Sequence, residues 1–209
     1  MEATNSVTRI AIFASGKGSN AQKIIDHFHS TLTSTSSKAE VEVKVELIIC
    51  NKQGAGVLNI ANKEKIPFII LEKEKFFMGD AYIPELKEKK IDLIVLAGFL
   101  WKIPELLIRA YPNRIINLHP ALLPKYGGKG MYGQHVHEAV IAAKEKESGI
   151  TIHYVDELYD HGRIIFQAKC PVTETDTADS LAEKIHKLEH AHFPRVIGEL
   201  IGMQNIVKK

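Results

Sequence analysis

Short apolar runs alternate with segments of helical spacing along most of this chain. Runs such as residues 10–14 and 47–50 are apolar at successive positions, which is typical of strands buried on both faces of a parallel sheet. The helical segments between them supply the crossovers that parallel strands require. We therefore predict an α/β fold with a doubly wound, mostly parallel sheet of about seven strands. The expected strands are residues 9–14, 41–50, 67–71, 91–97, 114–119, 149–155 and 164–172. The expected helices are residues 21–28, 56–64, 80–89, 104–110, 134–145 and 177–202.

Length and composition indicate one domain over residues 1–209, with residues 1–8 as a flexible N-terminal tail. Hydrophobic residues make up 45% and charged residues 25% of the chain, which is the balance of an ordinary globular protein. The net charge is +2 and the sequence has no dense basic stripe with interleaved aromatics, so we expect no nucleic-acid partner. No apolar run approaches the roughly 18 residues that a membrane span needs, so we expect no membrane partner.

The cysteines and the N-terminal sequence indicate the compartment. Cys50 and Cys170 lie in separate apolar runs and outside any C-x-x-C pair, so we expect buried thiols in a reducing environment. The first residues contain no apolar h-region of a signal peptide. We therefore expect a cytoplasmic protein, and the sequence leaves monomer and homodimer open.

A glycine-rich turn follows the first expected strand. Ser15-Gly16-Lys17-Gly18-Ser19-Asn20 leads into a segment of helical spacing, so unpaired backbone amides at the positive end of the helix dipole form an anion site. With Ala21 the turn also fits G-x-G-x-x-A, a permissive dinucleotide pattern. The acid that would bind a ribose hydroxyl is missing, because Cys50-Asn51-Lys52 stands at the end of the second strand. The turn therefore predicts a site for one phosphate rather than for NAD, and a plain capped turn is the alternative.

Asn117 and His119 lie two positions apart at the end of the fifth expected strand, so their side chains point to the same side. Pro120 has no amide hydrogen and ends the strand. The carboxyl end of a strand in an open α/β sheet is where ligands bind. We expect a reactive amide and imidazole pair there, and a satisfied polar strand end is the alternative.

An acidic loop follows the strand over residues 149–155. Its carboxylates are Asp156, Glu157 and Asp160, and its place late in the sheet allows it to face His119. A carboxylate beside a histidine stabilises the imidazolium, although most acidic loops are only solvated. A phosphate loop, an amide with an imidazole, and a carboxylate together suit the transfer of a carbonyl group to an amine on a phosphorylated small molecule.

The sequence His186-Lys187-Leu188-Glu189-His190 matches the zinc pattern H-x-x-E-H. A zinc site also needs a third ligand and an open cleft. His135, His137 and His192 are the candidates for further ligands. We expect no metal, and interpret the pattern as the polar face of an amphipathic helix.

Longer motifs extend over most of the chain, from Arg9 to about Leu200. They are Ser15–Asn20, Val95–Phe99, Asn117–Tyr126, Gly149–His153 and, further on, Asp160. In these motifs the chain resembles the folate-dependent formyltransferases, and its phosphate loop resembles that of the phosphoribosylglycinamide formyltransferases of purine biosynthesis. The resemblance implies a Rossmann-like domain that transfers the formyl group of the co-substrate 10-formyltetrahydrofolate directly to the amine of 5-phosphoribosylglycinamide. The reaction would pass through a tetrahedral intermediate.

The resemblance also implies roles for individual residues. The substrate phosphate would lie on the amides of the glycine-rich turn, and the pterin against two loops. Asn117 would bind the formyl oxygen, His119 would be the general acid and base, and Asp160 would hold His119 charged, with His153 as structural support. The catalytic residues are then Asn117, His119 and Asp160; those binding phosphoribosylglycinamide are Gly18, Ser19, Asn20 and Glu189; and those binding formyl-folate are Leu100, Trp101, Lys102, Ile103, Asn117, Asp156 and Asp160.

The chain departs from the family pattern at three places, and one of them is Gly79, which stands where some members have a folate-contacting arginine. Residues 128–133 form a longer glycine-rich turn, and Trp101-Lys102 replaces a frequent Met-Arg pair. Formyltetrahydrofolate hydrolase and methionyl-tRNA formyltransferase are related alternatives, although each usually carries an additional domain for which we expect no counterpart here. A nucleotide-binding module without catalysis is the alternative from another class.

Overall fold

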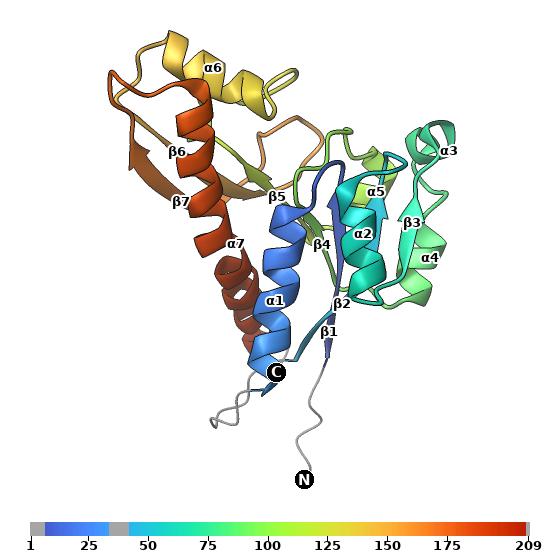
Figure 1. Cartoon of the computed structure of the whole chain (residues 1–209). Coiled ribbons are helices and arrows are strands. Elements are labelled where there is room, and N and C mark those ends of the chain that lie inside the picture. Colours follow the sequence, from blue (N-terminus) through green and yellow to red (C-terminus); the bar gives the residue numbers. More distant parts are fainter. Residues whose placement is uncertain (1–6, 34–41, 208–209) are drawn as a thin grey trace.

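Figure 1 shows a twisted sheet covered by helices in the computed structural model, which describes residues 7–33 and 42–207. The strands are β1 (Thr8–Ala14), β2 (Val43–Cys50), β3 (Phe68–Ile70), β4 (Leu93–Leu96), β5 (Ile115–His119), β6 (Glu147–Tyr154) and β7 (Ile164–Pro171). The helices are α1 (Ser19–Thr33), α2 (Gly56–Lys63), α3 (Lys73–Met78), α4 (Ile83–Glu88), α5 (Glu105–Ala110), α6 (Gln134–Ala142) and α7 (Ala178–Val207).

The seven strands form one sheet in the order β3-β2-β1-β4-β5-β6-β7. Strands β1 to β5 pair in parallel, whereas β6 runs antiparallel to both β5 and β7. The prediction of a mostly parallel, doubly wound α/β sheet is therefore confirmed. The strand order reverses between β1 and β4, and the carboxyl ends at such a switch point are the usual ligand site of this architecture.

Each face of the sheet has its own apolar core. Ile10 and Ile12 of β1 pack with residues of α1, α2 and α7 on one face. Phe13, which points the other way, packs with residues of α3, α4 and α5 on the second face. Figure 1 shows α1 beside the long helix α7, with α6 at the end of the sheet that holds β6 and β7. Burial on both faces explains why the central strands are continuously apolar in sequence.

Several boundaries differ from those predicted. The expected helix over residues 80–89 is the shorter α4, and α3 was not predicted at all. Helix α1 continues to Thr33, and the rest of the polar segment after it, residues 34–41, lies outside the described residues. Of the tail expected over residues 1–8, residues 1–6 also lie outside them, and Thr8 already begins β1. The single domain over residues 1–209 stays a prediction.

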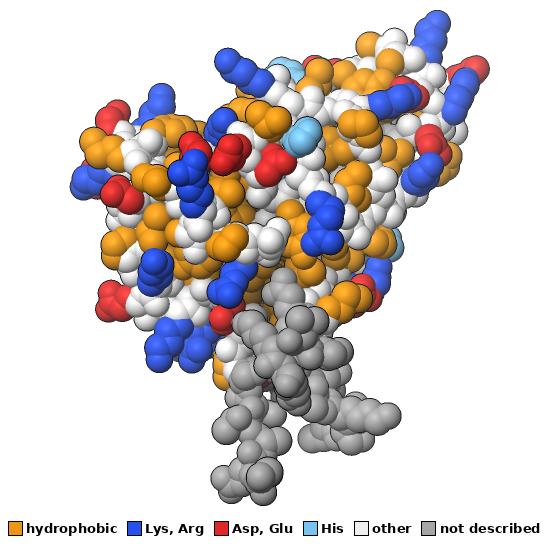
Figure 2. Space-filling view, turned by 180° about the vertical axis from the view of Figure 1, so that it is seen from behind, with side chains coloured by type: hydrophobic (Ala, Val, Ile, Leu, Met, Phe, Trp, Pro, Cys, Tyr) orange, Lys and Arg blue, Asp and Glu red, His pale blue; other side chains and the backbone are white. Residues whose placement is uncertain are grey.

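The surface charge and the length of the helices bear on the expected partners. Over the described residues of the face in Figure 2, Lys and Arg side chains are scattered among acidic and apolar ones. Among the helices that the structure describes, none is long and apolar enough to cross a bilayer. Cys50 is fully buried as expected, whereas Cys170 is only partly buried, and both are free thiols.

Candidate active site

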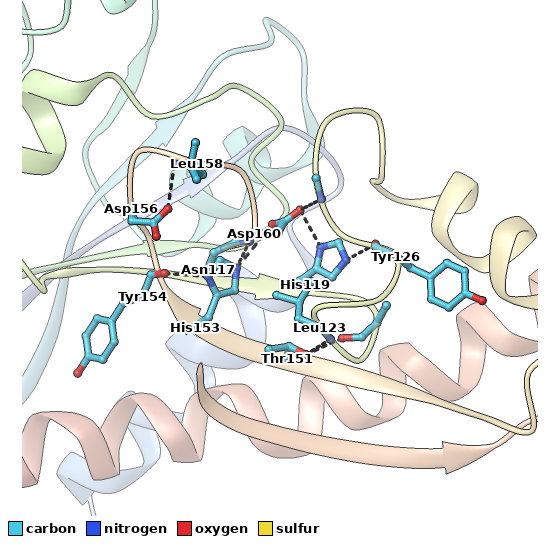
Figure 3. A network of polar contacts seen from close by, with 12 residues as sticks. Asn117, His119, Leu123, Tyr126, Thr151, His153, Tyr154, Asp156, Leu158 and Asp160 are labelled. Atoms are coloured by element: carbon cyan, nitrogen blue, oxygen red, sulfur yellow. Dashed lines mark hydrogen bonds and ion pairs between the residues drawn. The ribbon is translucent and has the colours of Figure 1, made fainter. Parts of the chain in front are cut away.

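The amide and imidazole lie where β5 meets β6. Asn117 and His119 share one side of β5, and the antiparallel register places His153 opposite Asn117 and Thr151 opposite His119. His119 is 3% exposed, so it is enclosed although it stands at a strand end. Figure 3 shows the side chains of Asn117, His119 and His153 gathered on one side of this strand pair.

Asp160 joins the pair from the loop between β6 and β7. Its Oδ2 lies 3.5 Å from Nδ1 of His119, and its Oδ1 lies 3.3 Å from Nδ2 of Asn117. The Gly128 amide donates to Oδ2 at 2.9 Å. Asp160 has a φ of +53°, a left-handed conformation that aspartate tolerates better than most residues. The structure therefore brings together all three residues that the sequence predicted to be catalytic (Figure 3).

The segment after His119 is held in place by backbone and side-chain contacts. Nε2 of His119 lies 2.8 Å from the backbone carbonyl oxygen of Tyr126. Thr151 donates to the carbonyl of Ala121 at 2.6 Å and accepts from the amide of Leu123 at 3.0 Å. These contacts fix the ring of His119 from the side opposite Asp160.

Burial and charge act in opposite directions on this histidine and carboxylate. Burial lowers the pKa of His119, although the Asp160 carboxylate and the Tyr126 carbonyl oppose the shift. For Asp160, burial is the largest influence and would raise its pKa, but contacts with His153, His119 and the Gly128 amide together hold its pKa below the ordinary value. Asp160 is therefore an anion at neutral pH, next to a histidine that can exchange a proton.

The glycine-rich turn leads directly into the start of α1. Gly18 has a φ of +81°, and a Cβ there would lie 2.8 Å from Cδ1 of Ile60. Ser15 ties the turn to the segment after β4, because its Oγ accepts from the Leu100 amide at 2.9 Å. The turn thus lies at the switch point of the sheet, at the carboxyl end of β1.

Helix α7 contributes to the same region through Glu189. Nδ2 of Asn20 donates to Oε2 of Glu189 at 2.9 Å, and Oδ1 of Asn20 is buried with no hydrogen-bond partner among the residues that the structure describes. Burial raises the pKa of Glu189, which the bond from Asn20 opposes. A buried carboxyl beside an unpartnered amide oxygen is suited to binding polar groups of a ligand.

The zinc-like pattern on α7 is explained by these contacts. Glu189 is tied to Asn20, while the rings of His186 and His190 stack 6.3 Å apart. Within residues 7–33 and 42–207, no group of three or more His, Cys, Asp or Glu side chains is arranged to hold a metal ion.

The loop predicted to bind the pterin only partly lines a cavity. A cavity of about 430 Å³ lies between this loop, α3 and the acidic loop. Lys102 and Ile103 line it, whereas Trp101 packs on Phe76 and Phe77, and Leu100 is 51% exposed outside the cavity lining. The cavity is lined by Phe77, Met78, Gly79, Lys102, Ile103, Pro104, Glu105, Leu106, Glu157 and Leu158.

Asp156 is also outside this cavity lining. Its Oδ1 accepts from the Leu158 amide at 2.9 Å, as Figure 3 shows. Its Oδ2 pairs with Nδ1 of His161 at 2.9 Å. Asp156 therefore shapes the acidic loop, while Leu158 contributes the apolar wall.

Two contributions were missed in the sequence. The Tyr126 carbonyl has no sequence signature, since a backbone oxygen belongs to every residue. Phe77 and Met78 were missed because α3 has only six residues, which is too short to show a helical period. Gly79 could have indicated the helix end, because glycine is the usual residue there; its φ is +96°.

The chain is similar to known proteins over most of its length. The family model described as formyl transferase matches residues 8–197. A phosphoribosylglycinamide formyltransferase of Bacillus subtilis is 36% identical over 201 residues, which cover 94% of this chain and 96% of that protein. The crystal structure of phosphoribosylglycinamide formyltransferase from Bacillus halodurans has 37% identity and a TM-score of 0.81, covering 93% of this chain and 95% of that one.

Some relatives are longer. A chloroplastic phosphoribosylglycinamide formyltransferase of Arabidopsis thaliana is 38% identical, and the chain spans 65% of its length. A trifunctional purine biosynthetic protein of Drosophila melanogaster is 39% identical, and the chain spans 14% of it. The match to the family model covers nearly the whole chain, so the chain belongs to the formyl transferase family.

Proposed function

We propose that this protein transfers the formyl group of 10-formyltetrahydrofolate to the amine of 5-phosphoribosylglycinamide, a step of purine biosynthesis. The observation that carries this is the convergence of Asn117, His119 and Asp160, with distances of 3.3 and 3.5 Å from the carboxylate to the other two. The similarity to the Bacillus subtilis enzyme over nearly the full length of both chains supports it.

The three side chains suit direct transfer. The substrate amine attacks the formyl carbon, a C–N bond forms, and the carbonyl electron pair moves to oxygen. The amide of Asn117 donates to that oxygen, and His119 takes the proton that the amine loses. The electron pair on oxygen then re-forms the carbonyl, the bond to the folate nitrogen breaks, and His119 returns its proton to this nitrogen. Asp160 stabilises His119 while it carries the proton.

Phosphoribosylglycinamide would bind between α1 and α7. Backbone amides of Gly18, Ser19 and Asn20 at the N-terminus of α1 suit the phosphate, because they are unpaired donors at the positive end of a helix. Glu189 lies 2.9 Å from Asn20 and is placed to bind the ribose or amine part.

Formyl-folate would bind along the loop after β4. The cavity beside Ile103 has apolar walls and carries Lys102, Glu105 and Glu157, which suits an aromatic compound with polar groups at its edge. We keep Leu100, Trp101, Asp156 and Asp160 in the proposed folate contact as well. Leu100 and Asp156 would reach it only from the rim, because neither lines the cavity.

The deciding experiment is an absorbance assay of 10-formyltetrahydrofolate deformylation, with and without 5-phosphoribosylglycinamide. We expect turnover only when the amine is present, and we expect a chelator to leave the rate unchanged because no step above uses a metal. Equal turnover without the amine would instead identify a hydrolase. If the protein binds 5-phosphoribosylglycinamide but does not deformylate 10-formyltetrahydrofolate, it is a non-catalytic binding module.

A further inference from the structure

One short backbone segment, which begins at Tyr126, contacts both members of the His119–Asp160 pair. The carbonyl oxygen of Tyr126 lies 2.8 Å from Nε2 of His119. The amide of Gly128 donates to Oδ2 of Asp160 at 2.9 Å. Between these two contacts, a Cβ on Gly127 would lie 3.2 Å from Cβ of Asp160, so the backbone passes directly against this carboxylate. The position of the segment therefore fixes the surroundings of both groups.

Tyr126 has a backbone conformation that needs support. Its φ is +56°, in the left-handed region that bulky residues seldom adopt. Its ring turns away from His119, as Figure 3 shows, and packs against the apolar core on the α1 and α7 side of the sheet. Its hydroxyl donates to Oε1 of Glu145 at 2.9 Å. The ring and the hydroxyl together anchor the residue whose carbonyl contacts His119.

Glu145 is placed for this contact by the turn between α6 and β6. Its amide donates to the carbonyl of Val140 at 3.3 Å, which closes the turn after the helix. Lys125 donates to the same carboxylate oxygen at 2.8 Å. The contacts with Lys125 and Tyr126 lower the pKa of Glu145, so Glu145 is an anion at neutral pH and accepts from both.

We propose that Glu145 is a positioning residue, which acts through the Tyr126 hydroxyl to hold the Tyr126 carbonyl on Nε2 of His119. The role in catalysis rests on the proposed formyl transfer. A charged His119 ring carries a hydrogen on each nitrogen, and these face Asp160 on one side and the Tyr126 carbonyl on the other. The carbonyl therefore stabilises the ring while it holds the proton of the amine. Glu145 itself gains and loses no atom in the reaction.

Three substitutions isolate this anchor. Tyr126→Phe removes the hydroxyl and keeps the ring in the core. Glu145→Leu removes the acceptor, whereas Glu145→Gln keeps an oxygen that can accept from the hydroxyl. Lys125→Met is the matched control, because it removes the other contact of the same carboxylate oxygen, from a side chain that is 67% exposed.

We expect Tyr126→Phe and Glu145→Leu each to lower kcat about three- to tenfold, which is the effect of one lost hydrogen bond on the transition state. The double variant should be no slower than the slower single variant, because both substitutions remove the same bond. KM for both substrates in every variant, and kcat of Glu145→Gln and Lys125→Met, should stay within about twofold of the wild type. Thermal melting checks that each variant folds. Wild-type kcat in Tyr126→Phe would overturn the role, and so would equal kcat in Glu145→Leu and Glu145→Gln.

The pKa of His119 tests the anchor without any activity measurement. Burial lowers this pKa, while the Asp160 carboxylate and then the Tyr126 carbonyl oppose the shift. Loosening the carbonyl should therefore lower the pKa of His119 further. His153 and His137 also lie close enough to interact with the charge of this ring, and both are unchanged in every variant.

NMR titration of the His119 ring in the ligand-free protein should show a lower pKa in Tyr126→Phe and Glu145→Leu than in the wild type. Lys125→Met should keep the wild-type pKa. An unchanged pKa of His119 in Tyr126→Phe would overturn the anchor. If the wild-type protein transfers no formyl group, the proposed function fails, while the titration still decides whether Glu145 holds the carbonyl on His119.

Discussion

Nδ1 of His119 lies 3.5 Å from Oδ2 of Asp160, with 4% and 11% of the two side chains exposed. The other ring nitrogen faces the carbonyl of Tyr126, so both nitrogens of His119 meet acceptors. Two acceptors favour a ring with hydrogens on both nitrogens, whereas burial disfavours the charge of that ring. The net effect lowers the pKa of His119, so the ring is neutral at pH 7 and can accept a proton.

Removing the charge of Asp160 should lower the pKa of His119 and slow the reaction. In Asp160→Asn nothing offsets burial except the Tyr126 carbonyl, so the pKa of His119 falls further. The acidic limb of the plot of kcat against pH should therefore move to lower pH, and kcat should fall by at least about tenfold because the protonated histidine loses its partner. A pH–rate profile of the purified variant measures both.

The matched control is Glu174→Gln, since the side chain of Glu174 is 93% exposed. Its profile should overlay the wild type. An Asp160→Asn profile that also overlays the wild type would remove Asp160 from the mechanism.

Loss of the imidazole should be more damaging than loss of the carboxylate. His119→Ala removes the group that accepts and returns the proton, so we expect kcat to fall by about 10²–10⁴. Steady-state kinetics with both substrates at saturation gives this ratio, and His29→Ala controls for a general effect of losing a histidine. Near-normal turnover in His119→Ala would mean that another group moves the proton.

The glycine-rich turn contains a matched pair for testing. Alanine at Gly18 would need a φ of +81° and a Cβ 2.9 Å from Cα of Val57, whereas a Cβ at Gly16 meets nothing within 4 Å. We expect Gly18→Ala to cost about 1–3 kcal/mol of unfolding free energy and to raise KM for phosphoribosylglycinamide. Gly16→Ala should stay within about 0.5 kcal/mol of the wild type in urea denaturation. Similar losses in both variants would show that any added side chain disturbs the turn.

Much of the sheet and the site could be predicted because their signals are local. The continuous apolar runs of β1, β2 and β4 predict buried strands, and Pro120 predicts where β5 stops. Asn117 and His119 were placed on one side by the alternation of a strand. These features depend on residues close together in sequence.

Features that depend on distant contacts could not be predicted in the same way. Asn20 meets Glu189 across 169 positions, so a helix face that resembled a zinc site contacts the segment after the glycine-rich turn. Trp101 turns into an aromatic cluster with Phe76 and Phe77 rather than into the cavity, because α3 packs beside it. The sequence around Trp101 does not indicate whether its ring packs in the aromatic cluster or lines the cavity.

His137 of α6 predicts how stability depends on pH. Its side chain is 4% exposed and Nδ1 has no hydrogen-bond partner among the described residues. Burial, with a smaller effect of His186 and His119, lowers the pKa of His137 to about 4 from 6.5. Between these two values the unfolded chain binds a proton that the folded chain does not, so stability is complete above pH 6.5 and falls as the pH drops toward 4. The loss should be roughly 3 kcal/mol.

Urea denaturation between pH 4 and 7 should show a weaker pH dependence in His137→Leu than in the wild type or in His29→Leu. Some dependence should remain, because the pKa of His190 is lowered by burial as well. Equal slopes in the three proteins would mean that His137 gains its proton as easily in the fold as outside it.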